Sequence, residues 1–391
     1  MSTDPTLRMP AAIDGFRLLA FADWYTPDAS GGAERAAWEI YRRLGAAGAL
    51  VHVVSAVHGP PHEDPNVEVS SIKSYDLSRI AGGYFAPAPA AFGATAKLVR
   101  AFEPSAMLTS TIHYTGCLAA ARTRAKTRIP LVVTAQLGAL DHLPALTRVV
   151  GGTYENTIGR YILHRADAVL AVSESVRTHV IGLGAARSKV TVSPNGVDHE
   201  RFGLPVVSAN DDPLVVSIGR LLHNKGSHLL VEAVGELRRA GTACRVVFVG
   251  DGPMRSKLES RVDELGVRDL VQFVGHVRDP EAWLAKAAIV VRASFTEGLS
   301  LAIIEAMAAG RCNIVSDIAP NRELITDQTN GLLFRCGDAT DLARALRAAV
   351  TDGALRERMA RQAQLDSEQY TWDRAAALHA EALLSVVGRC F

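Results

Sequence analysis

The sequence contains few cysteines, and their positions argue against several kinds of protein. Five cysteines are scattered through 391 residues, and no two have the spacing of a metal-ligand pair or of a redox pair. We therefore expect neither a disulfide framework nor a catalytic cysteine. Reduced and mostly buried thiols are predicted at Cys117, Cys244, Cys312, Cys336 and Cys390.

Long hydrophobic runs are missing as well. No apolar stretch approaches the roughly 18–20 residues that a membrane span needs, and residues 1–10 lack the apolar core of a signal peptide. These absences predict a soluble, cytoplasmic protein whose contact with the inner face of a membrane is at most peripheral. A basic cluster at 122–128 offers such a contact, although a solvated helix end is the simpler explanation.

A strong net charge is also absent. The formal net charge is +1 at pH 7, and this balance argues against a general nucleic-acid binder. Hydrophobic residues make up 48% of the chain. A chain of this length and composition can form two or three domains, each with a core of its own.

What the sequence does contain is a repeated order of strand, loop and helix in two blocks. Because helical periodicity separates most of the strands, the pattern predicts parallel sheets covered on both faces. The predicted fold class is α/β, with two doubly wound, Rossmann-like domains and a ligand cleft at the carboxyl ends of their strands, between the domains. The predicted strands lie at 16–21, 51–55, 106–110, 131–134, 168–172, 214–218, 244–249, 271–274, 289–291 and 313–316.

The boundary between the two blocks is expected in the Pro-, Gly- and Asp-containing stretch at 202–213. This position predicts a first domain at 1–205 and a second domain at 206–372. A final helix at 373–391 is expected to return to the first domain.

Two glutamates eight positions apart, Glu297 and Glu305, form the most informative pattern. Glu297 follows an apolar run at 289–292, and Glu305 lies where the apolar spacing has become helical. We expect Glu297 on a strand-to-helix loop and Glu305 about two turns into the helix. Amides at a helix N-terminus suit an anion such as phosphate, and carboxylates can bind polyol hydroxyls. The amides are those at Gly298, Leu299, Ser300 and Leu301.

The segment therefore outlines a nucleotide-sugar site. The alternative is an ordinary glycine-containing loop that opens a helix, with a glutamate that compensates the helix dipole.

Two further clusters follow predicted strands. Gly31 and Gly32 open a helix and would let backbone approach a phosphate, although a tight turn explains them equally well. Arg220 can donate a fork of hydrogen bonds to phosphate oxygens, and Lys225 adds a point charge. Ordinary surface charge is the alternative for these two cations. Gly252, after another strand, is a weak glycine signal when taken alone.

Taken in order, these segments resemble the family-4 retaining glycosyltransferases of the GT-B fold, also called glycosyl transferases group 1. The resemblance spans nearly the whole chain, and the ordered set is more specific than any of its members. The motifs are Gly-Gly-Ala-Glu at 31–34, Val-Ser-Glu-Ser-Val at 172–176, Pro-Asn-Gly-Val-Asp at 194–198, Gly-Arg…Lys-Gly at 219–226, Val-Gly-Asp-Gly-Pro at 249–253, the glutamate pair, Asn-Gly-Leu-Leu at 330–333 and Tyr-Thr-Trp at 370–372.

The resemblance implies a role for each matching position. Arg220 and Lys225 would neutralise the donor diphosphate, with help from the backbone at Gly32. Glu305 would bind the ribose hydroxyls, and Glu297 would hold hydroxyls of the transferred sugar. The amides at 298–301 would contact phosphate or sugar. The resemblance also implies that cations and a helix end, and no metal or other cofactor, stabilise the leaving diphosphate.

One position departs from the family pattern. Family members often carry a histidine after the strand aligned with 131–134, and here Gln136 takes that place. Glutamine does not act as a base, but it can hydrogen-bond a sugar hydroxyl. His113, after the strand at 106–110, is a second candidate in this region, with a satisfied structural histidine as the alternative. The departure leaves room for altered donor contacts.

The sequence thus predicts a metal-independent, retaining hexosyltransferase that moves a sugar from a nucleoside-diphosphate sugar, with UDP favoured, to an acceptor hydroxyl. The acceptor would be a small molecule or a lipid-linked saccharide, and no nucleic-acid partner is expected. The alternatives are a nucleotide-sugar epimerase or hydrolase of similar fold and a catalytically degenerate nucleotide-binding relative. A dinucleotide dehydrogenase is disfavoured because no Gly-x-Gly-x-x-Gly turn follows the first strand. The oligomeric state, the sugar and the acceptor stay open.

Overall fold

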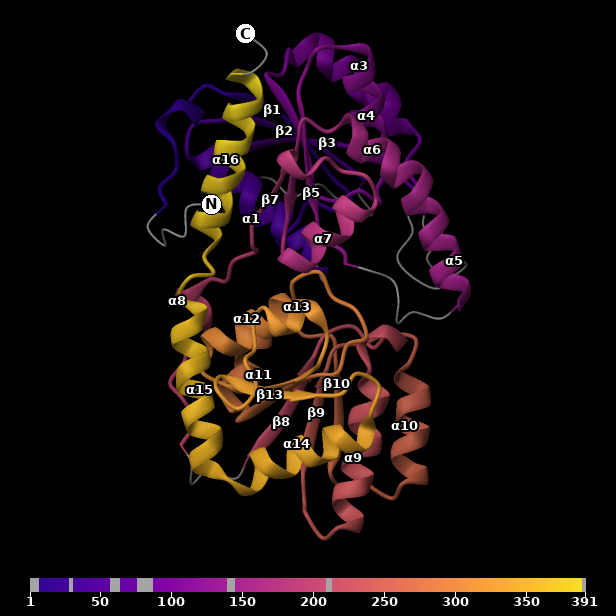
Figure 1. The fold of residues 1–391 in the computed structure, drawn as a ribbon, viewed down its shortest axis with the longest axis vertical. Helices are drawn as coiled ribbons and strands as arrows, with labels where there is room; N and C mark the ends of the chain where they lie inside the picture. Colours follow the sequence, from indigo (N-terminus) through magenta and orange to yellow (C-terminus); the bar gives the residue numbers. More distant parts are fainter. Residues whose placement is uncertain are drawn as a thin grey trace. The chain divides into compact units, whose positions relative to one another are not determined.

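The computed structural model describes residues 7–27, 31–56, 64–75, 87–138, 145–208 and 213–388. The chain forms two compact units (Figure 1). The first unit contains the described residues up to Gly196, together with the last helix from Trp372, and the second contains Val197–Thr371. The stretch at 202–213, where we expected the boundary, belongs to the second unit.

Seven parallel strands make up the sheet of the first unit in the described part of the chain, in the order β3-β2-β1-β4-β5-β6-β7. Most of their residues are buried, which explains why they are short, nearly continuous apolar runs. The strands are β1 (Arg17–Ala22), β2 (Leu50–Ser55), β3 (Val67–Ser71), β4 (Ala106–Thr109), β5 (Leu131–Ala135), β6 (Ala168–Ala171) and β7 (Val190–Val192).

Six parallel strands form the sheet of the second unit, as far as that unit is described, in the order β10-β9-β8-β11-β12-β13. These strands are β8 (Leu214–Ile218), β9 (Arg245–Val249), β10 (Val271–Gly275), β11 (Ile289–Arg292), β12 (Cys312–Ser316) and β13 (Gly331–Phe334). The predicted α/β fold with two doubly wound parallel sheets is confirmed. Each predicted strand is present with both ends within one residue of its expected position.

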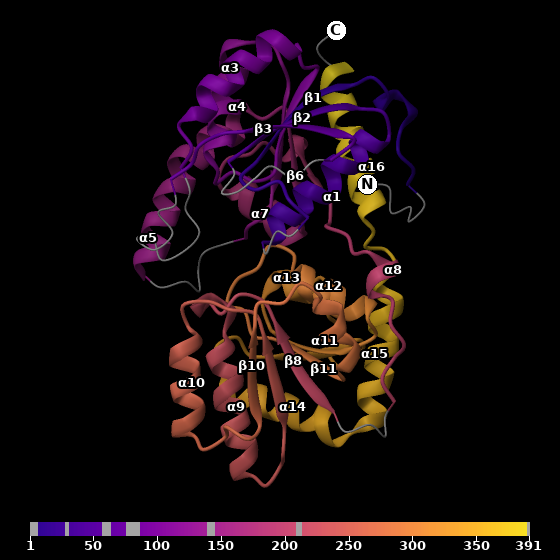
Figure 2. The same cartoon turned by 180° about the vertical axis from the view of Figure 1, so that it is seen from behind.

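The helices of the first unit cover its sheet in two groups (Figures 1 and 2). Helices α3 and α4 pack together, and α16 packs against α1, β5 and β6. The buried imidazole of His379 ties α16 to the sheet, because its Nε2 lies 3.1 Å from Oγ1 of Thr134. The helices are α1 (Gly32–Ala46), α3 (Ala90–Phe102), α4 (Thr115–Lys126), α5 (Ala145–Tyr154), α6 (Arg160–Arg165), α7 (Glu174–Gly182) and α16 (Trp372–Gly388), with a π-helical turn at Glu155–Gly159.

In the second unit, α9 packs against α10 and α14, and α12 packs against α15. A short 3-10 turn at His223–Lys225 precedes α9. The helices are α8 (His199–Phe202), α9 (Ser227–Arg239), α10 (Arg255–Glu264), α11 (Pro280–Lys286), α12 (Leu301–Ala308), α13 (Ala319–Arg322), α14 (Ala339–Thr351) and α15 (Gly353–Ser367).

The strand order of each sheet reverses at one pair of neighbours, β1 and β4 in the first unit and β8 and β11 in the second. Loops that leave the carboxyl ends of such a pair diverge to opposite faces of the sheet, and open α/β sheets bind ligands there. Most of the sequence-predicted site residues follow these four strands.

Cys117, Cys244 and Cys312 are free and buried, and Cys336 is free and partly buried, which confirms the prediction for these four thiols. Cys390 lies outside the described residues. No described helix has the length and apolar character that crossing a membrane requires.

Candidate functional site

Three loops meet at the carboxyl ends of β8, β9 and β11 in the second unit. They are joined by backbone hydrogen bonds: the amide of Leu221 donates to Asp251 at 2.9 Å, and that of Phe295 donates to Asn224 at 2.9 Å. Because these hydrogen bonds join neighbouring loops, the backbone holds the side chains of the three loops in fixed positions.

Two glycines let these loops come together. Gly226 has a φ of +67°, and a Cβ at this position would collide with the carbonyl oxygen of Ala293. Gly219 has a φ of +140°, and its Cβ would collide with the guanidinium of Arg292. L-residues avoid such backbone. A side chain at Gly226 would therefore separate the loop at 219–226 from the one after β11, and one at Gly219 would displace the guanidinium of Arg292.

Glu297 lies at the centre of a buried charge cluster. Lys225 Nζ donates to both of its carboxylate oxygens at 3.0 Å. Arg292 Nε donates to Oε1 at 3.0 Å, and Ser294 Oγ donates to the same oxygen at 2.7 Å. Arg292 also donates to the carbonyl of Ile218 at the end of β8. Four hydrogen bonds thus fix one carboxylate at the point where the strand order reverses.

The cluster holds its charges in defined states. Burial by itself would raise the pKa of Glu297, but the charges of Lys225 and Arg292 and the Ser294 hydroxyl outweigh it and lower the pKa to about 2. Burial lowers the pKa of Lys225, the Glu297 carboxylate opposes that effect, and the charges of Arg292 and Arg220 add to it. A second negative charge, from a bound anion, would relieve the crowding of these cations.

The N-terminus of α12 follows Glu297 directly. Ser300 is the N-cap residue, yet its hydroxyl makes no capping bond and, among the described residues, has no hydrogen-bond partner, although only 4% of the residue is exposed. Ser173, the N-cap of α7, shows the usual arrangement, in which Oγ accepts from the Val176 amide at 3.1 Å. The Ser300 hydroxyl and the helix-end amides are therefore suited to an external anion.

Glu305 is buried on α12, with 7% of the residue exposed. It lies little more than one turn into the helix and not about two, because α12 begins only at Leu301. Its negative charge contributes to a raised pKa of Arg201, after the larger contribution of Glu281.

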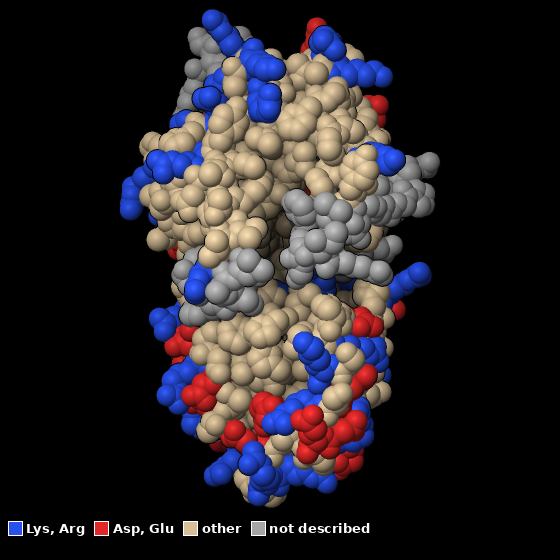
Figure 3. Space-filling model, turned by 90° about the vertical axis from the view of Figure 1, so that its right-hand side faces the viewer, with Lys and Arg blue, Asp and Glu red and all other residues tan. Residues whose placement is uncertain are grey.

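Arg220 differs from the other exposed arginines of the second unit. Basic and acidic side chains are intermixed on the face of this unit in Figure 3, and many form pairs such as Arg238 with Asp269 and Arg268 with Asp263. Arg220 is exposed, and its guanidinium has no hydrogen-bond or ion-pair partner in the described part of the chain. An exposed cation close enough to affect Lys225 remains available to a ligand.

The two candidates in the first unit have partners within the protein. Gln136 follows β5, and its Oε1 accepts a hydrogen bond from Nδ2 of Asn195 at 3.2 Å. His113 follows β4, and its Nε2 lies 3.2 Å from Oε1 of Glu155. The other oxygen of Glu155 lies 3.2 Å from Nε2 of His179. The two candidates thus bind different groups, and His113 belongs to a His–Glu–His cluster around Glu155 of the π-helical turn.

The predicted glycines have identifiable neighbours. Gly31 is the N-cap of α1, which begins at Gly32, and a Cβ at Gly31 would collide with the carboxylate of Glu34. A Cβ at Gly252 would lie 2.5 Å from the carbonyl oxygen of Leu221. Close packing against backbone therefore requires glycine at 252, whereas the Glu34 side chain beside Gly31 can move aside.

The two halves of the sequence match two family models. Residues 205–366 match Glycosyl transferases group 1, and residues 30–201 match Glycosyltransferase Family 4. The chain belongs to glycosyltransferase family 4. This membership agrees with the resemblance seen in the ordered motifs.

Relatives of the family-4 chain include two proteins of Streptomyces kanamyceticus. Alpha-D-kanosaminyltransferase is 34% identical over 166 residues, which are 42% of this chain and 42% of the relative. 2-Deoxystreptamine glucosyltransferase is 30% identical over 214 residues, 50% of this chain and 54% of the relative. The aligned regions thus span about half the length of these relatives.

Solved structures show the same GT-B fold. HepE of Anabaena, in complex with UDP-glucose, has a TM-score of 0.75 at 21% identity and covers 94% of this chain and 99% of its own. Sucrose-phosphate synthase from Thermosynechococcus elongatus has a TM-score of 0.82 at 19% identity, with 96% of this chain and 100% of its own covered.

Sequence reasoning missed three members of the site. Arg292 was visible as a charged residue at the end of an otherwise apolar strand, and Ser294 as a hydroxyl just beyond it. Asn195 stood in a motif that a turn explained. No described group of three or more His, Cys, Asp or Glu side chains is arranged to hold a metal ion.

Proposed function

We propose that the protein transfers a hexosyl group from a nucleoside-diphosphate sugar to an acceptor hydroxyl, with retention of anomeric configuration. The observation that carries the proposal is the Glu297 carboxylate clamped by Lys225 and Arg292 beside the N-terminus of α12. Family membership supports it, as do relatives named as glycosyltransferases. UDP is the favoured nucleotide because the similarly folded HepE is described in complex with UDP-glucose.

In this proposal the donor diphosphate lies against Lys225 and Arg220. A lysine ammonium has three donors, and Lys225 uses two of them on Glu297. The third is free to bind a phosphate oxygen, and Arg220 offers its guanidinium fork. As the diphosphate leaves, these cations compensate its growing negative charge, which is electrostatic stabilisation of the transition state. No metal or other cofactor is assigned a part.

The carboxylates bind hydroxyls of the donor. Oε2 of Glu297 accepts a hydrogen bond only from Lys225 among the described groups, so it keeps acceptor capacity for a hydroxyl of the transferred sugar. Glu305 takes the ribose hydroxyls. The hydroxyl of Ser300 and the amides at 298–301 bind phosphate or sugar.

The first unit contributes the acceptor side in this proposal. Gln136, held by Asn195, presents its amide to a sugar hydroxyl. The backbone at Gly31 and Gly32 approaches the diphosphate at the start of α1, and Gly252 is assigned to the same ligand. His113 is the second candidate on the acceptor side. A donor phosphate oxygen accepts the proton of the attacking acceptor hydroxyl. The acceptor itself is a small molecule or a lipid-linked saccharide.

A donor screen followed by product analysis tests the proposal. UDP- and GDP-linked hexoses are ranked by calorimetric binding to the wild-type chain, and the tightest donor is incubated with hydroxyl acceptors. We expect micromolar nucleotide binding, transfer that mass spectrometry detects, and a product whose anomeric NMR signal matches the configuration of the donor. Conversion of the donor without any acceptor would favour the epimerase or hydrolase instead. Binding with no turnover would favour a degenerate relative.

A further inference from the structure

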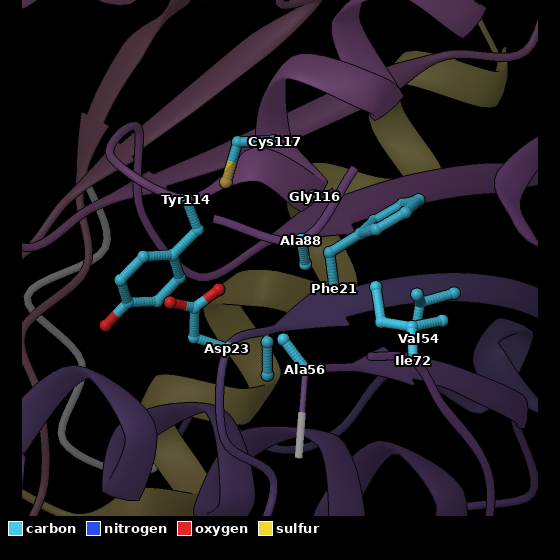
Figure 4. Close-up of a pocket in the computed structure, with 10 residues that line it drawn as sticks. Phe21, Asp23, Val54, Ala56, Ile72, Ala88, Tyr114, Gly116 and Cys117 are labelled. Atoms are coloured by element: carbon cyan, nitrogen blue, oxygen red, sulfur yellow. The ribbon is translucent and has the colours of Figure 1, made fainter. Parts of the chain in front are cut away.

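The first unit has a small pocket at the carboxyl ends of β1, β2 and β4 (Figure 4). Its walls are largely apolar, with Phe21, Val54 and Ile72 among them, and its polar members are Asp23 and Tyr114. The pocket lies where the strand order of this sheet reverses, the place at which open α/β sheets bind ligands. It is separate from the charge cluster around Glu297, which belongs to the other unit.

Asp23 is an unsatisfied acid in this pocket. Only 4% of the residue is exposed, and its carboxylate has no hydrogen-bond or ion-pair partner among the described residues. Figure 4 shows the carboxylate pointing toward Tyr114 and Cys117 in the pocket. Burial of an ionised carboxylate without a partner is strongly unfavourable. A carboxyl placed in this way is therefore either protonated, and so neutral, or paired with a group from a bound ligand.

The surroundings of Asp23 are negative. The negative charge of Glu34 acts on Asp23, and the Glu34 carboxylate accepts a hydrogen bond from the Tyr114 hydroxyl at 2.6 Å. Burial first, and Glu34 second, raise the pKa of Asp23 to about 8. In the described part of the chain no lysine or arginine pairs with either acid. Two acids without a protein cation favour a positively charged ligand.

The size of the pocket narrows the choice of cation. The pocket has room for about one group as large as a water molecule, which an ammonium group matches. A larger guanidinium would not fit beside Asp23.

We propose that this pocket holds the ammonium group of the acceptor, an amine-bearing polyol, and that this ammonium pairs with Asp23 while Glu34 adds a second negative charge. The assignment of the acceptor to this pocket rests on the proposed function. What this inference adds to the proposed function is that the pocket selects an amine over a hydroxyl at one position of the acceptor. Asp23 is thus a residue that determines acceptor specificity.

Direct binding measurements test this assignment without the transfer reaction. Glucosamine against glucose, and 2-deoxystreptamine against myo-inositol, are compared by saturation-transfer NMR on the wild-type chain and on Asp23→Asn. We expect the amines to bind at least about tenfold more tightly than their hydroxyl counterparts to wild type, and Asp23→Asn to abolish that preference. Equal binding of amine and hydroxyl by wild type, including no binding of either, would overturn the assignment. So would a preference that survives Asp23→Asn.

Two controls separate this proposal from others. Asp14→Asn makes the same chemical change at an exposed position before the amino end of β1 and should leave the preference intact. Asp23→Asn should melt at the wild-type temperature or above, since it removes a buried ionisable group. Calorimetric UDP binding is measured in parallel: unchanged UDP affinity of Asp23→Asn is expected. If the wild-type chain does not bind UDP, the proposed function is contradicted. The amine preference and its dependence on Asp23 would still be tested by the NMR comparison.

Discussion

Nζ of Lys225 lies 3.0 Å from both carboxylate oxygens of Glu297, a residue 72 positions further along the chain. The two groups come together because β8 and β11 are neighbours in the sheet. This pair determines the charge of the proposed donor site, so its substitution gives the most direct predictions.

Lys225→Met should lower UDP affinity and kcat/KM about 10- to 100-fold, because one charge-assisted hydrogen bond to phosphate is worth roughly 1.5–3 kcal/mol. Arg292 and Ser294 still hold Glu297, so the fold should persist. Calorimetry with UDP and steady-state kinetics measure the two effects. Lys257→Met, at an exposed position on α10, is the matched control and should change neither value. Unchanged UDP affinity of Lys225→Met would refute the diphosphate role.

The two glutamates should separate binding from turnover. Glu305→Ala should weaken UDP binding about tenfold, since it removes the acceptor for ribose hydroxyls. Glu297→Gln keeps the shape of the side chain but not its charge, and should mainly lower kcat because the transferred sugar loses its position. UDP affinity and kcat are measured for both variants. Equal and negligible effects of the two substitutions would contradict the assignment.

Glu155 should make stability depend on pH in the acidic range. Burial would raise its pKa, but hydrogen bonds and charges from His113 and His179 lower it to about 2. A folded pKa below the unfolded value of 4.5 stabilises the native state above about pH 4.5, and this stabilisation is lost as the pH falls toward 2. Glu155→Gln should therefore cost about 3 kcal/mol of unfolding free energy at pH 6.

Urea titrations at pH 6 and pH 3 test this expectation. The difference between wild type and Glu155→Gln should shrink markedly at pH 3. Glu174→Gln, which breaks an exposed pair with Arg177 on α7, should cost no more than about 0.5 kcal/mol at either pH. A difference that is the same at both pH values would show that the His–Glu–His cluster contributes through packing alone.

Gly226→Ala should lower both the unfolding free energy and the UDP affinity by more than its unfavourable φ alone would explain. Its φ of +67° and that of Gly241, +76°, are similarly unfavourable for alanine, at about 1–2 kcal/mol each. Only at Gly226 does the new Cβ meet backbone, whereas nothing lies within 4 Å at Gly241. Gly226→Ala should thus lose more stability than Gly241→Ala and also weaken UDP binding. Comparable unfolding free energies and intact UDP affinity in both variants would argue against this account.

Some features of the fold could not be predicted from the sequence, for local physical reasons. β3 reads Val-Glu-Val-Ser-Ser and is an edge strand with exposed residues, so its apolar signal is weak. β7 contains only three residues, too few to show a period. The start of α12 at Leu301 depends on how the loop after Glu297 packs, and its late start explains the error for Glu305.

By itself the sequence determined the positions of the buried strands, the two-block α/β fold and the order of the family motifs, because buried parallel strands need continuous apolar runs and loops at their ends need glycine and charge. Only the tertiary structure decided which charges meet. The order of strands in a sheet places Lys225, Arg292 and Glu297 within hydrogen-bonding distance, and no local pattern encodes that order. The same holds for Asp23, whose burial without a partner becomes visible only when four separate chain segments close around it.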